Sequence, residues 1–477
     1  VISTNTNTHL NVIKNIFSKK IYNKIIFCEK PCGNSLQEIK KIYEISKKFK
    51  SKVFVNYMRS SMNSLNELIK FSNFNKSYFK GVAYYNKSIL NDASHYINLF
   101  QKIFKKLGIT NIDHRTKESD FSYQDSYPIM PSLGCNLNDL KKYKNIILVG
   151  VNVKTEYPVL SIRLNALAKN NTKVYSFNFN SLEENFSLHH KQIITHDNID
   201  LFLNTSNFSL ENGETLFIIG PSVSRSPNQS SILRKISEFS SSIDANIGFL
   251  TEFCNSTSGW LLGNLPHREL GGGKPRQIGK NSYEMIKSHL SSYIFYNLEP
   301  EFDFFNKQDL EHALDTSKCN IFFTSYITPI IEKYADIIIP ITTFAETDGG
   351  YINIEGTYQT FQPIVQPSKN IHVGWSTLND ILKLNNLGDY SIDEIRGELA
   401  ESLDGLNFST PVSDMSDINS NNDMENVIAH DLSRETNETD LIVRRSESLR
   451  QVSLMNKKIN NKNIISQSDN LQTNVTK

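Results

Sequence analysis

The chain has 477 residues, enough for about three domains of ~150 residues each. Hydrophobic residues make up 39% and charged residues 21%, which excludes a wholly disordered or collagen-like chain. The 51 basic and 50 acidic side chains leave a net charge of +1, so no sequence-wide field attracts nucleic acid or an anionic membrane. The longest apolar runs, such as 337–341, are too short for a bilayer core of ~30 Å. We therefore expect no nucleic-acid partner and no membrane insertion. The start at Val1, without a signal-peptide pattern, indicates a fragment.

Two short apolar strands, at 24–28 and 52–55, flank a helix-like stretch at 35–49. This βαβ rhythm predicts a largely parallel sheet for residues 1–105. The rhythm continues to about residue 395, with helices at 159–169 and 230–239 and strands at 145–149, 173–177, 216–219, 293–296, 320–324 and 336–339. We expect α/β architecture with Rossmann-like parallel layers. From 401 to 477 the composition shifts to Ser, Asn, Asp and Glu, which predicts a largely disordered tail with a candidate docking patch at 441–445.

The five cysteines are Cys28, Cys32, Cys135, Cys254 and Cys319, and only the first two are close in sequence. Iron–sulfur clusters and structural zinc need about four ligands, usually in C-x2-C pairs. The pattern therefore predicts no metal and no disulfide framework, and it favours a reducing compartment.

The motif Cys28-Glu29-Lys30-Pro31 directly follows the first predicted strand, where open α/β sheets bind ligands. Lys30 could polarise a substrate hydroxyl there, or it could be half of a solvated Glu–Lys pair. With the segments 2–9, 55–59 and 90–95, the motif resembles the Gfo/Idh/MocA family of NAD(P)-dependent sugar and polyol dehydrogenases. The resemblance covers residues 1–105 and implies a catalytic lysine at Lys30 and a catalytic histidine at His95.

This dehydrogenase-like segment departs from the family pattern at two points. Asn91 holds the position where the family often has an aspartate, so no carboxylate polarises the imidazole. The family's G-x-G-x-x-G motif, which cradles the pyrophosphate, does not precede Val1. Dehydrogenase activity with NAD(P) is therefore the alternative interpretation.

A second set of landmarks follows in order: Asn-Ile-Asp-His-Arg at 111–115, Leu-Glu-Pro-Glu at 298–301, Tyr-Ala-Asp-Ile-Ile-Ile-Pro at 334–340, Glu-Thr-Asp-Gly-Gly at 346–350 and Ile-Val-Arg-Arg at 442–445. From about 107 to 450 this order resembles the C-terminal half of the large iron–sulfur subunit of NADH-quinone oxidoreductase (respiratory complex I), within the molybdopterin oxidoreductase superfamily. The superfamily-like domain is expected at 107–400.

This second resemblance implies a structural segment of the complex I peripheral arm that supports NADH-to-quinone electron transfer. Its partners would be the other peripheral-arm subunits, on the cytoplasmic side of a bacterial inner membrane or the matrix side of a mitochondrion. The complete complex uses iron–sulfur clusters and FMN, and we expect this chain alone to bind no cofactor and to be inactive.

Several residues of the second segment admit two interpretations. Gly150 and Gly220 suit tight turns after strands, and Gly349-Gly350 suits a turn with positive φ. Asn353, Glu355 and Gln359 could form a pocket floor, in the region that holds the pterin dinucleotide in molybdopterin enzymes. Cys135 is a weak candidate for a molybdenum ligand, and we prefer the purely structural interpretation.

No linker separates the two segments that carry these resemblances, and the segments meet at 97–108. Since both partners are truncated there, our hypothesis is a recombination or sequence-assembly join.

Overall fold

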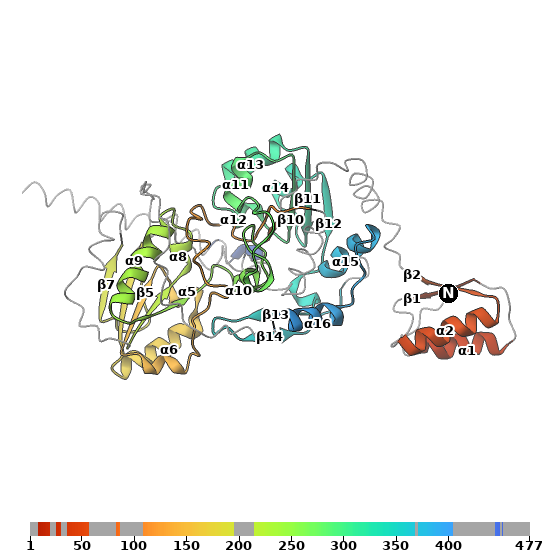
Figure 1. Ribbon diagram of the computed structural model, residues 1–477, viewed down its shortest axis with the longest axis horizontal. Helices are drawn as coiled ribbons and strands as arrows, with labels where there is room; N and C mark the ends of the chain where they lie inside the picture. Colours follow the sequence, from red (N-terminus) through yellow and green to blue (C-terminus); the bar gives the residue numbers. More distant parts are fainter. Residues whose placement is uncertain are drawn as a thin grey trace, which may run out of the picture. The chain divides into compact units, whose positions relative to one another are not determined.

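The computed structural model describes residues 8–19, 25–29, 36–56, 83–85, 108–194, 214–367, 371–403, 444–448 and 451. They fall into two compact units, Val1–Lys76 and Ser77–Lys477 (Figure 1). The fold is α/β with parallel sheets, as predicted. Among the described helices, none combines the length and apolar character needed to cross a bilayer.

The described residues of the first unit form a parallel strand pair and two helices. Strand β1 (Ile25–Glu29) pairs with β2 (Lys52–Asn56), and helix α1 (His9–Ser18) contacts α2 (Leu36–Lys48). The core is small and consists of Ile13, Phe17, Ile26 and Ile42. Phe17 also stacks on Phe49, with 4.8 Å between ring centroids. The predicted βαβ order of this region is confirmed.

The second unit contains two five-stranded sheets, of which the first is built from one continuous stretch of chain. Its strand order is β7-β6-β5-β8-β9, and all neighbours are parallel. The strands are β5 (Asn145–Val149), β6 (Lys173–Asn178), β7 (His190–Ile193), β8 (Thr215–Ile219) and β9 (Asn246–Phe249). The predictions for β5, β6 and β8 are confirmed.

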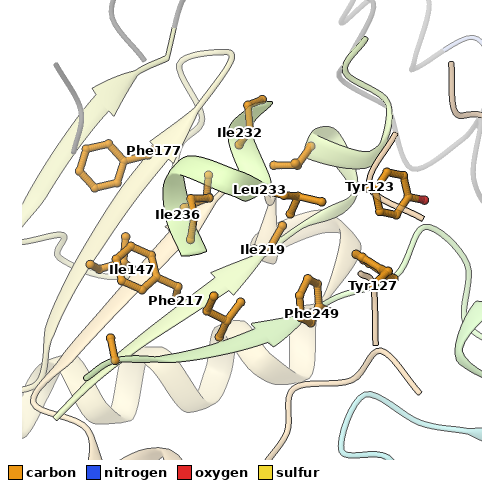
Figure 2. Packing of buried hydrophobic residues seen from close by; sticks show 14 of the residues in the cluster. Tyr123, Tyr127, Ile147, Phe177, Phe217, Ile219, Ile232, Leu233, Ile236 and Phe249 are labelled. Atoms are coloured by element: carbon orange, nitrogen blue, oxygen red, sulfur yellow. The ribbon is translucent and has the colours of Figure 1, made fainter. Parts of the chain in front are cut away.

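Both faces of the central strands of this sheet are buried beneath helices (Figure 1). Alternate residues of β5 point to opposite faces, as the two-residue period of a strand requires. Ile147 lies in the cluster that contains Ile232 of α9 (Gln229–Ser242), as Figure 2 shows. Ile146 lies in the cluster that contains Leu160 of α6 (Pro158–Lys169). Such two-sided burial explains why the strand sequences are continuous apolar runs.

The second sheet joins segments that are far apart in the sequence. Its order is β12-β11-β10-β3-β4, all parallel, with β3 (Ala83–Tyr85), β4 (Ile112–Asp113), β10 (Ser292–Tyr296), β11 (Cys319–Thr324) and β12 (Ile337–Pro340). Its core packs against α11 (Ser282–Lys287), α13 (Lys307–Thr316) and α14 (Pro329–Tyr334). The chain of the first sheet is thus inserted between β4 and β10.

This arrangement differs from the predicted boundary between residues 105 and 107. The compact units divide after Lys76, and β3 lies in a sheet of the second unit, between β4 and β10. The physical reason is that parallel partners are separated by long crossovers, so a local βαβ rhythm does not identify which strands pair.

The described part of the second unit also includes a hairpin and the two helices that follow it. The hairpin strands are β13 (Gly349–Ile352) and β14 (Tyr358–Phe361), and the helices are α15 (Gly374–Leu384) and α16 (Ile392–Leu403). The predicted turn at Gly349-Gly350 is wrong, because both glycines lie within β13. A Cβ atom on Gly350 would lie 2.5 Å from the hydroxyl of Tyr358, so the Tyr358 side chain packs closely over this glycine.

Candidate functional site

A crevice forms where the carboxyl ends of β5, β8 and β9 meet. The chain continues from β5 to β6 on one side and from β8 to β9 on the other. This junction is the topological switch point, where open α/β sheets bind ligands. Gly150 ends β5 with φ +62°, and a Cβ there would lie 2.7 Å from Val223. The tight turn predicted at Gly150 is confirmed, and it brings the loop after β5 against the loop after β8.

The crevice holds a cavity of about 160 Å³. Its walls come from residues 155–157 after β5, Pro221 and Arg225 after β8, 251–254 after β9, and 352–354 in the hairpin loop. Three strand ends and one hairpin therefore contribute to a single site.

Arg225 dominates the electrostatics of the crevice. Its Nε donates to Glu252 Oε2 at 2.7 Å, and its Nη2 donates to Glu156 Oε1 at 2.9 Å. The three side chains are only 6%, 7% and 12% exposed. Burial acts to lower the pKa of Arg225, but the two carboxylates outweigh it and raise that pKa. The trio ties together the loops after β5, β8 and β9 and carries one net negative charge.

A second polar group, which we call the inner cluster (Asp113, His114, Arg115, Glu118 and Tyr123), lies beside this crevice at the end of β4. Arg115 forms a two-pronged ion pair with Asp113, with Nε–Oδ1 at 2.9 Å and Nη2–Oδ2 at 2.8 Å. Both side chains are fully buried, at 1% and 0% exposure. Each loses hydration on folding, and the two-pronged geometry offsets part of that loss.

Glu118 is the member of the inner cluster with an unusual protonation state. Burial raises its pKa to about 8, although the Arg115 guanidinium acts in the opposite direction. The Tyr123 hydroxyl donates a short hydrogen bond to Glu118 Oε2. Tyr123 in turn packs edge to face on Tyr127, with 4.9 Å between centroids (Figure 2). Glu118 is therefore mostly protonated at neutral pH.

His114 presents a buried acceptor within the inner cluster. Its Nδ1 lies 3.0 Å from the Asn264 carbonyl oxygen. Because a carbonyl only accepts, Nδ1 carries the proton and Nε2 keeps its lone pair. Burial lowers the pKa of His114 to about 4, so the ring is neutral at pH 7. His114 and Glu118 line a cavity of about 20 Å³, which is room for one water molecule.

The residues predicted to act in catalysis or to form a pocket differ in where the structure places them. Lys30 and His95 lie outside the described residues, so their assignment stays a prediction. Asn353 does line the crevice. Glu355 Oε1 instead accepts from the Leu137 amide at 2.6 Å, and Gln359 accepts from Asn353 across the hairpin. Of these three predicted residues, Asn353 lines the cavity, while Glu355 and Gln359 make hydrogen bonds elsewhere in and around the hairpin.

Cys135 does not carry the features of a ready metal ligand. Burial raises the pKa of its thiol to about 11, which favours the protonated form over the thiolate that metals bind. In the described part of the chain, no group of three or more His, Cys, Asp or Glu side chains is placed to hold a metal ion.

The Arg225 trio was not predicted from the sequence, and of the inner cluster only the residues at 113–115 were noted there, as part of a landmark. Arg225 and Glu252 are 27 positions apart, in loops without a distinctive pattern. Their position in the sequence could have indicated them, because Arg225 and Glu252 each follow a buried parallel strand near the switch point.

Comparison with known proteins identifies the family. The profile of the molybdopterin oxidoreductase family matches residues 34–384. The chain therefore belongs to this family. The match crosses the predicted join at 97–108 and includes residues that the Gfo/Idh/MocA resemblance covered, so it gives that resemblance no support.

One curated relative is the mitochondrial NADH-ubiquinone oxidoreductase 78 kDa subunit of Candida albicans. It is 23% identical over 342 residues, which are 68% of this chain and 43% of the relative. The chain thus spans less than half of that relative's length.

Two solved structures show partial similarity. Acetylene hydratase from Pelobacter acetylenicus matches with a TM-score of 0.45 and 10% identity, over 68% of this chain and 57% of that one. A chain of the formyltransferase/hydrolase complex from Methylorubrum extorquens matches with a TM-score of 0.45 and 11% identity. The match covers 72% of this chain and 98% of that one.

The residues at the switch point do not fit the pterin dinucleotide that the family name implies. A dinucleotide pyrophosphate requires cations or free amides, whereas Arg225 is held between two buried carboxylates. The cavity of about 160 Å³ is also smaller than the ~300–1,000 Å³ typical of ligand pockets. Glu156 and Glu252 would repel the phosphates.

Proposed function

We propose that this chain is a structural segment of the peripheral arm of NADH-quinone oxidoreductase (respiratory complex I). The Candida albicans relative, named as a subunit of that enzyme, supports this assignment. In this role the chain holds neighbouring subunits in place for NADH-to-quinone electron transfer. Iron–sulfur clusters and FMN would belong to other parts of the complete complex.

The observation that carries the structural role is the Arg225 trio. The position where an open α/β sheet binds its ligand is here lined by side chains that pair with one another, with Arg225 within 2.9 Å of both carboxylates. Three strand-end loops are cross-linked, which rigidifies the edge that a cofactor would need to enter. Such a site supplies stability and shape instead of chemistry.

The location and partners follow from this proposal. We infer contact with other peripheral-arm subunits, on the cytoplasmic side of a bacterial inner membrane or the matrix side of a mitochondrial one. The NAD(P)-dependent alternative with Lys30 and His95 receives no support from the family match or from the curated relative.

Native electrophoresis of gently solubilised source membranes tests the assignment. With an antibody against this chain, we expect the chain to migrate with in-gel NADH dehydrogenase activity. A second membrane complex, detected on the same gel, controls for incidental co-migration. Recovery of the chain only as a free species would contradict the proposal.

Analysis of the purified chain tests its structural character separately. We expect neither molybdenum nor the fluorescent oxidation product of a pterin. Stoichiometric molybdenum and pterin would contradict the conclusion drawn from the Arg225 trio, even if the chain co-migrated with complex I.

A further inference from the structure

The second sheet has a switch point of its own, between β3 and β10. The chain leaves β3 toward β4 and leaves β10 toward β11, so a crevice is expected at the carboxyl end of β10. Two acidic side chains lie there, Glu299 and Asp303, on the loop and short helix α12 (Pro300–Asp303) that follow β10. Their side chains are 5% and 0% exposed.

These carboxylates are fixed in place by the surrounding chain. Asp303 Oδ2 accepts a hydrogen bond from the Glu299 amide at 2.8 Å. The other carboxylate oxygen, Oδ1, is not used in this hydrogen bond. The Asp303 carbonyl accepts from the Thr116 hydroxyl at 2.6 Å. Lys117 donates to the Phe304 carbonyl at 2.8 Å. The loop after β4 therefore holds the acidic loop in a defined position.

The C-terminal segment places two consecutive arginines on this acidic loop, within the predicted docking patch at 441–445. Arg444 is 2% exposed, and its Nη2 lies 2.9 Å from Asp303 Oδ1. Its Nη1 lies 3.3 Å from Glu299 Oε2. Arg445 donates from Nη2 to the other oxygen of Glu299, Oε1, at 2.8 Å. Glu299 thus bridges both guanidinium groups.

Aromatic rings complete the surroundings of both cations. The Arg444 guanidinium carbon lies 4.4 Å from the Phe302 ring centroid. The Arg445 guanidinium carbon lies 3.3 Å from the Tyr326 ring centroid, in the loop after β11. Flat guanidinium groups stack on rings in a way that a lysine ammonium does not reproduce.

We propose that the acidic loop after β10, with the aromatic rings beside it, is a recognition site for a peptide with two consecutive arginines, and that the C-terminal segment is its ligand in cis. We call it the diarginine site, formed by Glu299, Phe302, Asp303 and Tyr326. Two carboxylates match two guanidinium charges, and the rings select arginine over lysine. Because all of the groups that recognise the ligand lie at 299–326, the site is complete without covalent connection to residue 444. This proposal does not depend on the complex I assignment.

The test uses the full chain with Arg444→Ala and Arg445→Ala together, which vacates the site. A fluorescent peptide of residues 440–450 is titrated into this variant, and binding is followed by anisotropy. We expect saturable binding, and at least about tenfold weaker binding of the same peptide with both arginines replaced by lysine. Adding Glu299→Gln and Asp303→Asn is expected to abolish binding. A folded double variant that does not bind the peptide would overturn the proposal.

A measurement on the unaltered chain covers the case in which the double variant does not fold. A tethered segment competes at an effective concentration in the millimolar range. With about 10 mM peptide, we expect displacement of the chain's own segment, seen as faster amide hydrogen exchange at 444–448. The lysine peptide serves as the matched control. Exchange that is the same with either peptide would overturn the proposal.

Discussion

Burial, more than neighbouring charge, sets the protonation of Glu118 and His114 in the inner cluster. Glu118 keeps its proton because its ionised form would be desolvated, even with Arg115 nearby. His114 loses its proton for the same reason, as does His267, whose pKa falls to about 2. The carboxyl and both rings are therefore mainly neutral around pH 7.

Glu118→Gln tests this protonation pattern. The folded-state pKa of about 8 exceeds the reference value of 4.5, so the folded state binds more protons between these values. The contribution of Glu118 to the free energy of unfolding is fully present below pH 4.5 and is lost as the pH rises through 8. From about pH 6.5 to 8, the free energy of unfolding of the original chain should decrease by about 2 kcal/mol more than that of the variant.

Urea unfolding at the two pH values measures this difference. The histidines act in the opposite direction, because their lowered pKa values cost stability only as pH falls below about 6.5. The chosen window therefore isolates Glu118 from His114 and His267. Parallel pH profiles for the two proteins would show that Glu118 is already ionised.

Gly259→Ala tests how closely His114 is packed. A Cβ at Gly259 would lie 2.9 Å from ring atoms of His114, which the Asn264 carbonyl holds in place. We expect destabilisation of about 1–3 kcal/mol from overpacking. Gly397→Ala is the matched control, because this helical position has no atom within 4 Å of the added Cβ. There alanine should stabilise by about 0.5–1 kcal/mol, as thermal unfolding would show.

At the scale of elements, the sequence predicts buried strands well and their partners poorly. Strands β5, β8, β10 and β11 were found because two-sided burial produces continuous apolar runs. Strand β7 was missed because its four residues are mostly exposed at the sheet edge. The pairing of β3 with β10 depends on contacts between distant segments, which no local pattern encodes.

The same limit applies to the candidate site. The sequence located the strands β5 and β8 whose following loops build two of its walls, and Asn353 does reach the cavity, but strand β9 and the loop after it were not predicted. It did not predict that Arg225 would join Glu156 and Glu252, because that arrangement depends on three loops meeting at one sheet edge.

Arg225→Ala tests whether the trio stabilises these loops. Removing the guanidinium leaves two buried carboxylates without their cation, which typically costs about 3–5 kcal/mol. Restoring neutrality with Glu156→Gln and Glu252→Gln should recover part of this loss. Arg234→Ala is a matched control, because Arg234 is 33% exposed and lies 3.9 Å from Glu238. Its loss should cost less than about 1 kcal/mol in urea unfolding.

At the scale of the whole molecule, the division after Lys76 separates two cores of very different size. The first unit relies on a few apolar side chains around Phe17, whereas the second has several extended clusters. Each unit has its own hydrophobic core, so we expect separate cooperative unfolding of the two.

Phe17→Ala and Phe295→Ala test this separation by calorimetry. Phe17 is 1% exposed, and Phe295 stacks on Phe322 in the second sheet at 4.5 Å between centroids. Each truncation should cost about 3–5 kcal/mol, but in a different transition. If both substitutions lowered the same single transition, the chain would unfold as one cooperative unit.

The first sheet is inserted in the chain between β4 and β10, and this has a consequence for folding during synthesis. Strand β3 leaves the ribosome about 200 residues before β10, its partner in the sheet. At ~5–20 residues per second, β3 waits on the order of 10–40 s for that partner. The first sheet is contiguous and can assemble during this interval. A nascent chain stalled before residue 292 would therefore display a completed first sheet and an unpaired β3 edge, and such an edge favours association with other chains.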